Sequence, residues 1–160
     1  MTGLSRRQML QGAAAAAGLG LAAPLLAAAS GRFPIAFSDA EWRRRLDRDA
    51  YAVLRRAATE RPHSSPLDRE RRSGTFACKG CGNALFRSST KFDSGTGWPS
   101  FYAAVQGAVG TSRDGSGLGA RTEVHCARCG GHLGHVFRDG PRPTGLRYCI
   151  NGAALRFRPA

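Results

Sequence analysis

Five cysteines, four of them in two identical Cys-x-x-Cys spacings, constrain the fold of this 160-residue chain more than any other feature. The pairs are Cys78 with Cys81 and Cys126 with Cys129. A two-residue spacing turns both thiolates toward one point, and two such pairs complete a tetrahedral site of four sulfurs. Two disulfides are the alternative in an exported protein. Glycines permit the positive φ of a tight turn around a metal and so favour zinc. They lie within or directly after the two pairs: Gly80, Gly82, Gly130 and Gly131.

The gap between the two cysteine pairs, from Gly82 to His125, is far longer than in a compact zinc finger. We therefore expect the metal to join distant parts of one larger domain, in a structural role. Four thiolate ligands leave no open position for water, so the chemistry must lie elsewhere. Cys149, the remaining cysteine, is the candidate nucleophile, and His132 and His135 between the second pair and Cys149 are candidate proton donors.

The first thirty residues have the pattern of a targeting segment. Arg6 and Arg7 precede an uncharged run, rich in alanine and leucine, from Gly12 to Ala29. This pattern is typical of a twin-arginine export signal, and the small residues at its end offer a cleavage site. We expect residues 1–30 to be a signal and the protein to be exported to the periplasm. The alternative is an uncleaved membrane anchor, although its many alanines make the run only weakly hydrophobic.

The chain is strongly basic. Its formal charge of +13 falls to +11 without Arg6 and Arg7, and four zinc-bound thiolates with one Zn²⁺ would lower it by two more, to +9. Such a surplus can signal nucleic-acid binding. The arginines are interspersed with acids, however, as in residues 43–49, and no stripe of aromatic and basic residues accompanies them. We therefore expect mainly solvated surface, no nucleic-acid partner, and membrane contact only through the signal segment.

Residues 31–160 suit one domain that begins with helices and continues as β-structure. Ser38 to Glu41 has capping-box spacing and Asp47 can cap a second helix, so short helices are expected over about 39–58. From about 74 to 158, short apolar segments alternate with glycine-rich turns, which predicts antiparallel β-structure.

The glycine-rich stretch 107–120 is poor in apolar residues. It is expected to be a hairpin tip or loop, and we assign it no chemistry.

Three long motifs carry a resemblance to a known family: GTFACKGCGNALF, KFDSGTGWPSFY and HCARCGGHLGHVFRDGPRPTGLRYCINGAALRF. Over about residues 36–158 the chain resembles the methionine-R-sulfoxide reductases. The resemblance implies a mainly β domain of two antiparallel sheets with short N-terminal helices, stapled by a zinc site of four cysteines. It also implies that the substrates are proteins carrying the R epimer of methionine sulfoxide, each epimer having its own enzyme.

The resemblance also implies roles for individual residues. It places the nucleophile on Cys149, the methyl-recognising indole on Trp98, and the paired imidazoles on His132 and His135. Histidine suits proton donation near neutral pH, when the sulfoxide oxygen must leave as water or hydroxide. Without the resemblance, Trp98 could equally be a core residue.

The residues around Cys149 have expected roles of their own. A thiol needs a positive neighbour to ionise at neutral pH. If residues 146–150 form a strand, Arg147 and Cys149 share a face and the guanidinium can lie beside the sulfur. Arg147 could equally make a structural ion pair. Asn151 is expected to orient Cys149 or a water, and Phe137 to close the pocket wall around the methyl group.

One residue departs from the family pattern. Thr96 stands where many relatives carry a resolving cysteine. With the four other cysteines committed to zinc, the sulfenic acid formed on Cys149 has no internal partner. We therefore expect a thioredoxin-like or other external thiol to regenerate the enzyme.

The alternative function is an exported zinc-ribbon module that binds a partner or serves as structure, without catalysis. Both forms of that alternative leave Cys149 unexplained.

Overall fold

A computed structural model of the chain describes residues 33–115 and 121–160. The expected signal segment, residues 1–30, lies outside these ranges. Within them, no helix is both long and apolar enough to cross a membrane.

Two short helices open the described part, as predicted. They are α1 (Asp39–Arg45) and α2 (Arg48–Arg56). Ser38 and Glu41 form the full capping box at α1, and the Asp47 side chain accepts a hydrogen bond from the Ala50 amide at the start of α2. The second helix ends slightly before the expected boundary because Ala57 adopts a left-handed conformation, with φ of 52°.

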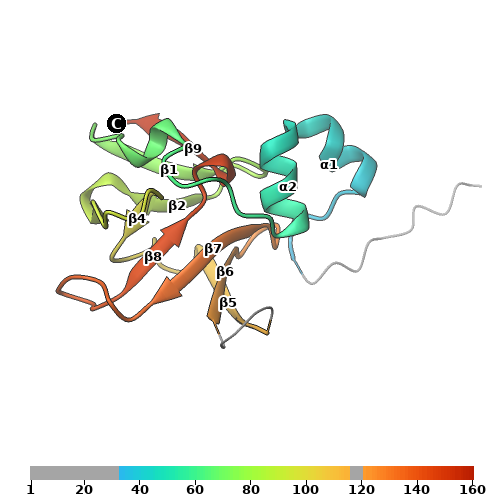
Figure 1. Ribbon diagram of the computed structural model, residues 1–160. Helices are drawn as coiled ribbons and strands as arrows, with labels where there is room; N and C mark the ends of the chain where they lie inside the picture. Colours follow the sequence, from blue (N-terminus) through green and yellow to red (C-terminus); the bar gives the residue numbers. More distant parts are fainter. Residues whose placement is uncertain (1–32, 116–120) are drawn as a thin grey trace, which may run out of the picture.

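The rest is mainly β, in two antiparallel sheets (Figure 1). The three-stranded sheet has the order β2 (Ala84–Arg87), β1 (Gly74–Cys78), β9 (Leu155–Pro159). The six-stranded sheet has the order β3 (Lys91–Phe92), β4 (Ser100–Phe101), β8 (Arg147–Ile150), β7 (His132–Phe137), β6 (Arg121–Cys126), β5 (Val109–Asp114). Three short 3-10 helices complete the described part: η1 (Pro66–Asp68) lies between α2 and β1, while η2 (Ser88–Thr90) and η3 (Gly152–Ala154) connect strands. The predicted fold class is confirmed.

A cluster of phenylalanines joins the two sheets. Phe76 of β1, Phe86 of β2 and Phe101 of β4 are all fully buried. The Phe101 ring stacks on Phe86 at 4.4 Å between centroids and meets Phe76 edge-on at 4.9 Å. Because successive side chains of a strand point to opposite faces, this packing fixes one face of the large sheet toward the core.

The helices pack on the cysteine turns. A Cβ on Gly80 would lie 3.3 Å from the Trp42 ring, and one on Gly131 would lie 2.9 Å from Leu54. These two glycines therefore make room for the helices. Gly82 and Gly130 have the positive φ expected of a metal turn, at 75° and 65°.

The prediction that residues 107–120 form a hairpin tip or loop was wrong for Val109–Asp114, which is strand β5 of the β5–β6 pair. This strand is poor in apolar residues, but its pairing with β6 supplies the backbone hydrogen bonds that stabilise it. A Cβ on Gly110 would lie 2.5 Å from the His125 ring, so a side chain there would force that ring to move. Residues 116–120 of the segment lie outside the described ranges.

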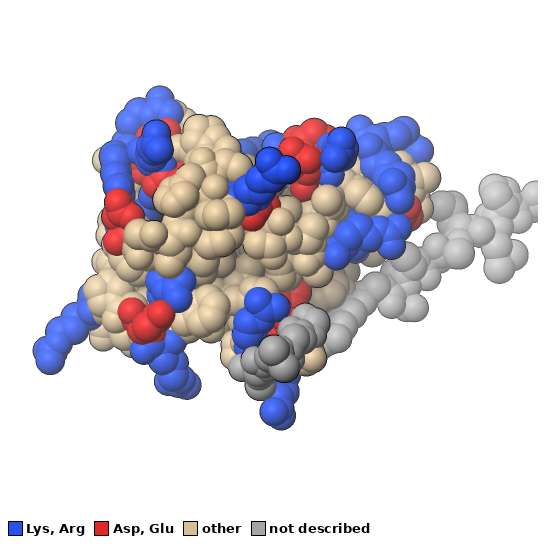
Figure 2. All heavy atoms as spheres, in the orientation of Figure 1, with Lys and Arg blue, Asp and Glu red and all other residues tan. Residues whose placement is uncertain are grey.

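Lys and Arg side chains are scattered over the face shown in Figure 2, with Asp and Glu among them. On that face the acidic residues break up the basic ones, in agreement with the interspersed sequence pattern.

Candidate functional site

A row of polar side chains crosses the six-stranded sheet. In register, Ser112 of β5 lies opposite Glu123 of β6, which lies opposite His135 of β7. His135 in turn lies opposite Cys149 of β8, which lies opposite Ser100 of β4. Directly opposite residues point to the same face, with Cβ atoms about 4.5–5.5 Å apart. The register therefore places one polar side chain from each of five strands on the same face of the sheet. This face is opposite the one that packs on the phenylalanine cluster.

A β-bulge adds His132 to this row. Two residues of β6, Val124 and His125, face the three residues His132–Gly134 of β7. Three residues apart on a regular strand, His132 and His135 would point to opposite faces, but one extra residue restores a common face. Their rings lie 5.5 Å apart in an edge-on arrangement. The two histidines predicted from sequence are therefore neighbours.

Hydroxyl groups connect to the Cys149 sulfur from the β4 side. Thr96 Oγ1 lies 3.9 Å from Cys149 Sγ, and Ser94 Oγ lies 2.8 Å from Thr96 Oγ1. The fully buried Ser100 continues the chain, with its Oγ 2.7 Å from that of Ser94. Thr96 therefore approaches the candidate nucleophile as closely as the sequence resemblance implied.

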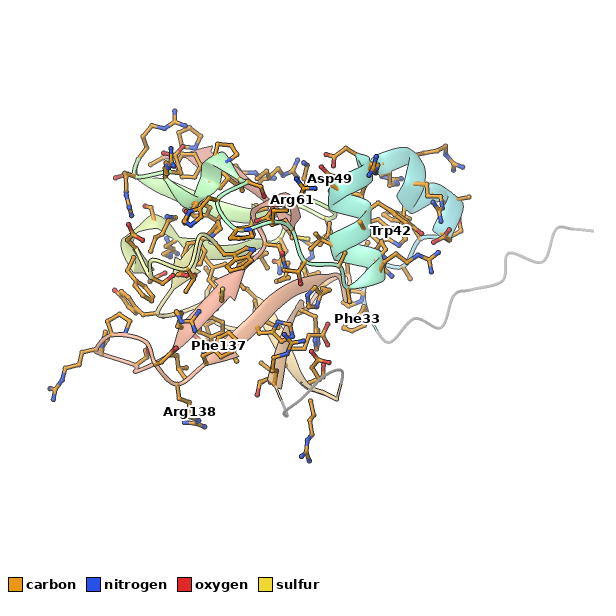
Figure 3. The ribbon with its side chains drawn as sticks, viewed as in Figure 1. Phe33, Trp42, Asp49, Arg61, Phe137 and Arg138 are labelled. Carbon is orange, nitrogen blue, oxygen red and sulfur yellow. The ribbon has the colours of Figure 1, made fainter. Side chains whose placement is uncertain are left out.

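Arg147 makes the ion pair that was one of its two expected roles. Its guanidinium donates two hydrogen bonds to Asp139, at 2.9 and 2.8 Å, and lies over the Phe137 ring at 4.4 Å from its centroid. Phe137 also faces His135, with ring centroids 6.5 Å apart. In Figure 3, Phe137 lies along the β7–β8 pair while Arg138 points away from it. Phe137 thus lies beside the polar row.

Burial raises the pKa of the Cys149 thiol. Hydrogen bonding by Thr96 and the nearby charge and hydrogen bond of Arg147 act in the opposite direction without fully offsetting burial. The positive neighbour expected from sequence is therefore present, but the ionised sulfur is still disfavoured.

Each histidine of the row has a carboxylate partner. His132 Nδ1 lies 2.8 Å from Glu123 Oε1, and His135 Nε2 lies 2.8 Å from Asp114 Oδ2. Sequence analysis missed both acids. Glu123 could have been found from alternation, since it lies two residues before His125 on the polar side of the strand. Asp114 was not recognised because its strand was predicted to be a hairpin tip or loop.

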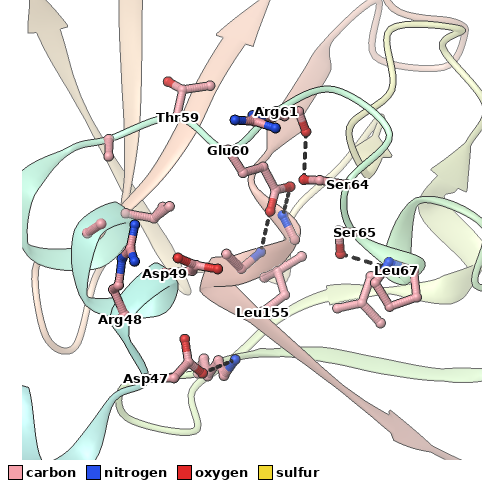
Figure 4. Close-up of a pocket in the computed structure, with 17 residues that line it drawn as sticks. Asp47, Arg48, Asp49, Thr59, Glu60, Arg61, Ser64, Ser65, Leu67 and Leu155 are labelled. Carbon is pink, nitrogen blue, oxygen red and sulfur yellow. Dashed lines mark hydrogen bonds and ion pairs between the residues drawn. The ribbon is translucent and has the colours of Figure 1, made fainter.

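Glu60, also missed, ties the loop after α2 to both sides of the site. Its backbone carbonyl accepts a hydrogen bond from Trp98 Nε1 at 3.3 Å, and its backbone amide donates to Asn151 Oδ1 at 3.0 Å. Its carboxylate accepts from the Gly152 and Ala153 amides at 2.5 and 2.8 Å, bonds that Figure 4 draws. Burial raises the pKa of Glu60, and the two amides partly offset that effect.

Asn151 acts on the backbone beside Cys149. Its Nδ2 donates to the Leu133 carbonyl at 3.0 Å, while its Oδ1 accepts from Glu60. The side chain, almost fully buried, thus holds the end of β8 to β7 and to the Glu60 loop. Any orientation of Cys149 by Asn151 therefore operates through these backbone contacts.

Two hollows border the site. One of about 440 Å³ adjoins Thr96, Arg147 and Asp139, the three residues that act on the Cys149 pKa. Its lining is Phe92, Asp93, Ser94, Thr96, Asp139, Gly140, Pro141 and Arg147. The other, of about 750 Å³, lies between α2 and η1 on the far side of Glu60 and is drawn in Figure 4. The first hollow therefore lies beside the two side chains that lower the Cys149 pKa.

The four paired cysteines form a metal-type centre. Their sulfurs all lie within 4.8 Å of one another, with Cys78 to Cys129 at 3.8 Å and Cys81 to Cys126 at 3.6 Å. Sulfurs placed tetrahedrally at about 2.3 Å from Zn²⁺ would be about 3.8 Å apart. The donor set and spacing therefore fit a structural metal ion held by Cys78, Cys81, Cys126 and Cys129.

The chain is similar to known proteins over most of its length. The SelR domain family matches residues 46–159. A peptide methionine sulfoxide reductase MsrB of Bradyrhizobium diazoefficiens is 59% identical over 123 residues, covering 76% of this chain and 88% of that protein. The MsrB proteins of Leifsonia xyli and Leptospira interrogans are 54% identical over 134 residues and 51% identical over 122 residues, covering 82% and 76% of this chain and 96% and 93% of their own lengths.

Among solved structures, the Yippee-like domain of Mis18 aligns with a TM-score of 0.43 at 21% identity, over 56% of this chain and 98% of that domain. That likeness is too loose to bear on the fold or the function.

Proposed function

The chain belongs to the SelR domain family of peptide methionine sulfoxide reductases, and from this premise we propose that it reduces the R epimer of methionine sulfoxide in proteins through Cys149. The observation that carries the proposal is the register of the large sheet. That register puts the one cysteine outside the metal-type centre opposite a histidine, beside a second histidine and a hydroxyl group. A binding or structural module has no need of such a row.

The reaction balances with the groups present. The Cys149 thiolate attacks the sulfoxide sulfur, and two protons convert the sulfoxide oxygen to water, which leaves. A second water attacks the cysteine sulfur of the resulting sulfonium, breaks its S–S bond, releases methionine and returns one proton. The net change is that a thiolate, a sulfoxide and one proton become a sulfenic acid and a thioether.

The side chains of the row supply the remaining roles. His132 and His135 deliver protons to the sulfoxide oxygen, and Arg147 with Thr96 stabilises the thiolate of Cys149. Trp98, fixed by its hydrogen bond to the Glu60 carbonyl, and Phe137, fixed by Arg147, form the apolar wall for the S-methyl group. An apolar wall on one side of the sulfur and proton donors on the other would distinguish the two epimers.

The metal at the four-cysteine centre is proposed to be one structural Zn²⁺ per chain. It would cross-link the turn after β1 to the turn after β6 and supply no chemistry, because four sulfurs fill its coordination.

We propose that the reductant is an external thiol, either that of a thioredoxin-like protein or a small thiol compound. One thiol condenses with the sulfenic acid of Cys149 and releases water; a second resolves the mixed disulfide and restores the thiol. The positions of the cysteines support an external reductant, because Thr96 and not a cysteine lies beside the Cys149 sulfur.

Export by the twin-arginine route to the periplasm is proposed on the strength of Arg6, Arg7 and the uncharged run that follows them. The twin-arginine route transports folded proteins, so the metal centre would already be formed when the chain crosses the membrane. Replacing both arginines by lysine is expected to retain the precursor inside the cell. Normal export of that variant would assign the segment to the general secretory route.

Separate assays on the two epimers of N-acetyl-methionine sulfoxide test the proposed function. The purified domain, with dithiothreitol as reductant, is expected to consume the R epimer and leave the S epimer. Reduction of neither epimer, together with salt-dependent binding to nucleic acid, would favour the module without catalysis.

A further inference from the structure

Glu123 lies in the polar row between Ser112 and His135, and three side chains surround its carboxylate. It accepts a hydrogen bond from Ser112 Oγ at 2.5 Å and one from His132 Nδ1 at 2.8 Å. His125 Nδ1 lies 3.9 Å from Oε2, the oxygen that also accepts from Ser112. An ionised carboxylate can only accept, so His132 must carry a proton on Nδ1. The atom of His132 left for chemistry is therefore Nε2.

Burial raises the pKa of Glu123, but the hydrogen bonds from Ser112 and His132 and the nearby imidazoles outweigh burial and hold that pKa below its ordinary value. The carboxylate is thus ionised throughout the neutral range. The other charged or titratable groups near this face are Asp114, Arg121, His125 and His135 from β5 to β7, and Arg147 and Cys149 from β8.

His132 Nε2 is buried without a hydrogen-bond partner among residues 33–115 and 121–160. Only 7% of the His132 side chain is exposed. A buried polar atom without a partner costs about 1–3 kcal/mol, so native proteins keep few of them. The ring lies edge-on to His135, which is directly opposite Cys149. A partner that arrives with the substrate would satisfy this atom.

His135 differs in this respect. Its Nε2 is already hydrogen-bonded to Asp114 at 2.8 Å. Of the two rings, His132 is therefore the one whose Nε2 is buried without a partner among the described residues.

We infer that Glu123 is a positioning residue for the proposed reduction, holding His132 so that Nε2–H donates to the sulfoxide oxygen. The inference rests on the proposed function and assigns roles within it. In the protonated ring, the Nδ1 proton stays on the ring, hydrogen-bonded to Glu123. The Nε2 proton passes to the sulfoxide oxygen as the S–O bond breaks. The ring is left neutral, with its lone pair on Nε2, and regains its proton from water. Ser112 holds the carboxylate from the opposite side.

The test compares Glu123→Gln, His132→Gln and the double variant with wild type on the R epimer. A neutral amide neither holds the Nδ1 proton firmly nor balances the charge of the ring. We expect kcat to fall about 100-fold in each single variant, with KM nearly unchanged. The double variant should be no slower than the slower single variant, because both changes disable one unit.

Two readouts separate positioning from mere structure. The alkylation rate of Cys149 by iodoacetamide should be unchanged in Glu123→Gln, since the sulfur is influenced by Thr96 and Arg147. Glu70→Gln is the matched control, because the Glu70 carboxylate bonds to Arg72 outside the row. It should retain wild-type kcat. If Glu123→Gln does not fold, Ser112→Ala replaces it. We expect Ser112→Ala to lower kcat several-fold in the wild-type background and to cause no further loss in the His132→Gln background.

Full kcat in Glu123→Gln, or losses that multiply in the double variant, would overturn the role of Glu123 while leaving the reductase function intact. A wild-type enzyme inactive on the R epimer would instead contradict the proposed function itself.

Discussion

Cys149 lies directly opposite His135 in the β7–β8 pair, so the proposed nucleophile and a proposed proton donor share one face of the sheet. The same pairing brings Gly134 against the backbone of Cys149. A Cβ at Gly134 would collide with the Cys149 carbonyl oxygen and crowd the Cα of Ile150, at 3.1 Å. The bulge that aligns the two histidines therefore depends on a residue without a side chain.

Gly134→Ala is expected to displace β8 from β7 and lower the free energy of unfolding by at least about 2 kcal/mol, because the obstructing atoms are backbone and cannot rotate away. Activity on the R epimer should fall with it. Gly115→Ala is the control, since no atom of residues 33–115 and 121–160 lies within 4 Å of a Cβ there. Equal thermal melting of the two variants would argue against the tight β7–β8 contact.

The pH dependence of Cys149 alkylation follows from its raised pKa. Burial disfavours the thiolate, so reactivity toward iodoacetamide should still be rising above pH 9.0, the ordinary value. Thr96→Val and Arg147→Met each remove an effect that lowers this pKa, so both should move the midpoint further up and slow alkylation at pH 7. Arg43→Gln, in α1, should change nothing. A midpoint below 9.0 in wild type, followed on the Cys149 peptide by mass spectrometry, would contradict the dominance of burial.

Turnover without reductant should leave Cys149 as a sulfenic acid. After one equivalent of substrate, dimedone should add to Cys149 stoichiometrically. Thr96→Cys should instead give a disulfide with Cys149, because Thr96 Oγ1 is already 3.9 Å from the sulfur. Finding Cys149 bonded to a cysteine of the metal-type centre in wild type, with metal released at each cycle, would move that centre into the mechanism.

Metal removal should unfold the domain. Elemental analysis is expected to give one Zn²⁺ per chain, retained in Cys149→Ser and lost in Cys81→Ser. Chelation should abolish the cooperative melting transition, because the four sulfurs join turns far apart in the sequence and the helices pack on those turns. A metal-free protein with native melting and full activity would rule out a structural role.

Sequence alone predicted those features that depend on local chemistry. The caps of α1 and α2 were found because Ser38 and Asp47 act within three residues. The metal-type centre was found because Cys-x-x-Cys spacing fixes each half locally.

Features that depend on strand register were not predicted. Glu123 and Asp114 gain their histidine partners only through the pairing of β5, β6 and β7, including a bulge. Glu60 reaches Asn151 and the η3 amides across about ninety residues of chain, a contact that no local pattern reports. The strand β5 was missed because its pairing and not its apolar content stabilises it.

Single-turnover reduction of the R epimer by wild type and Cys149→Ser tests the central claim most directly. Without added thiol, wild type should form one methionine per chain, and Cys149→Ser should form none while keeping its metal and its melting temperature. The serine hydroxyl has nearly the same shape, but its oxygen cannot attack the sulfoxide and be oxidised as the cysteine sulfur is to a sulfenic acid. Stoichiometric methionine from folded Cys149→Ser would show that the reducing sulfur is not Cys149.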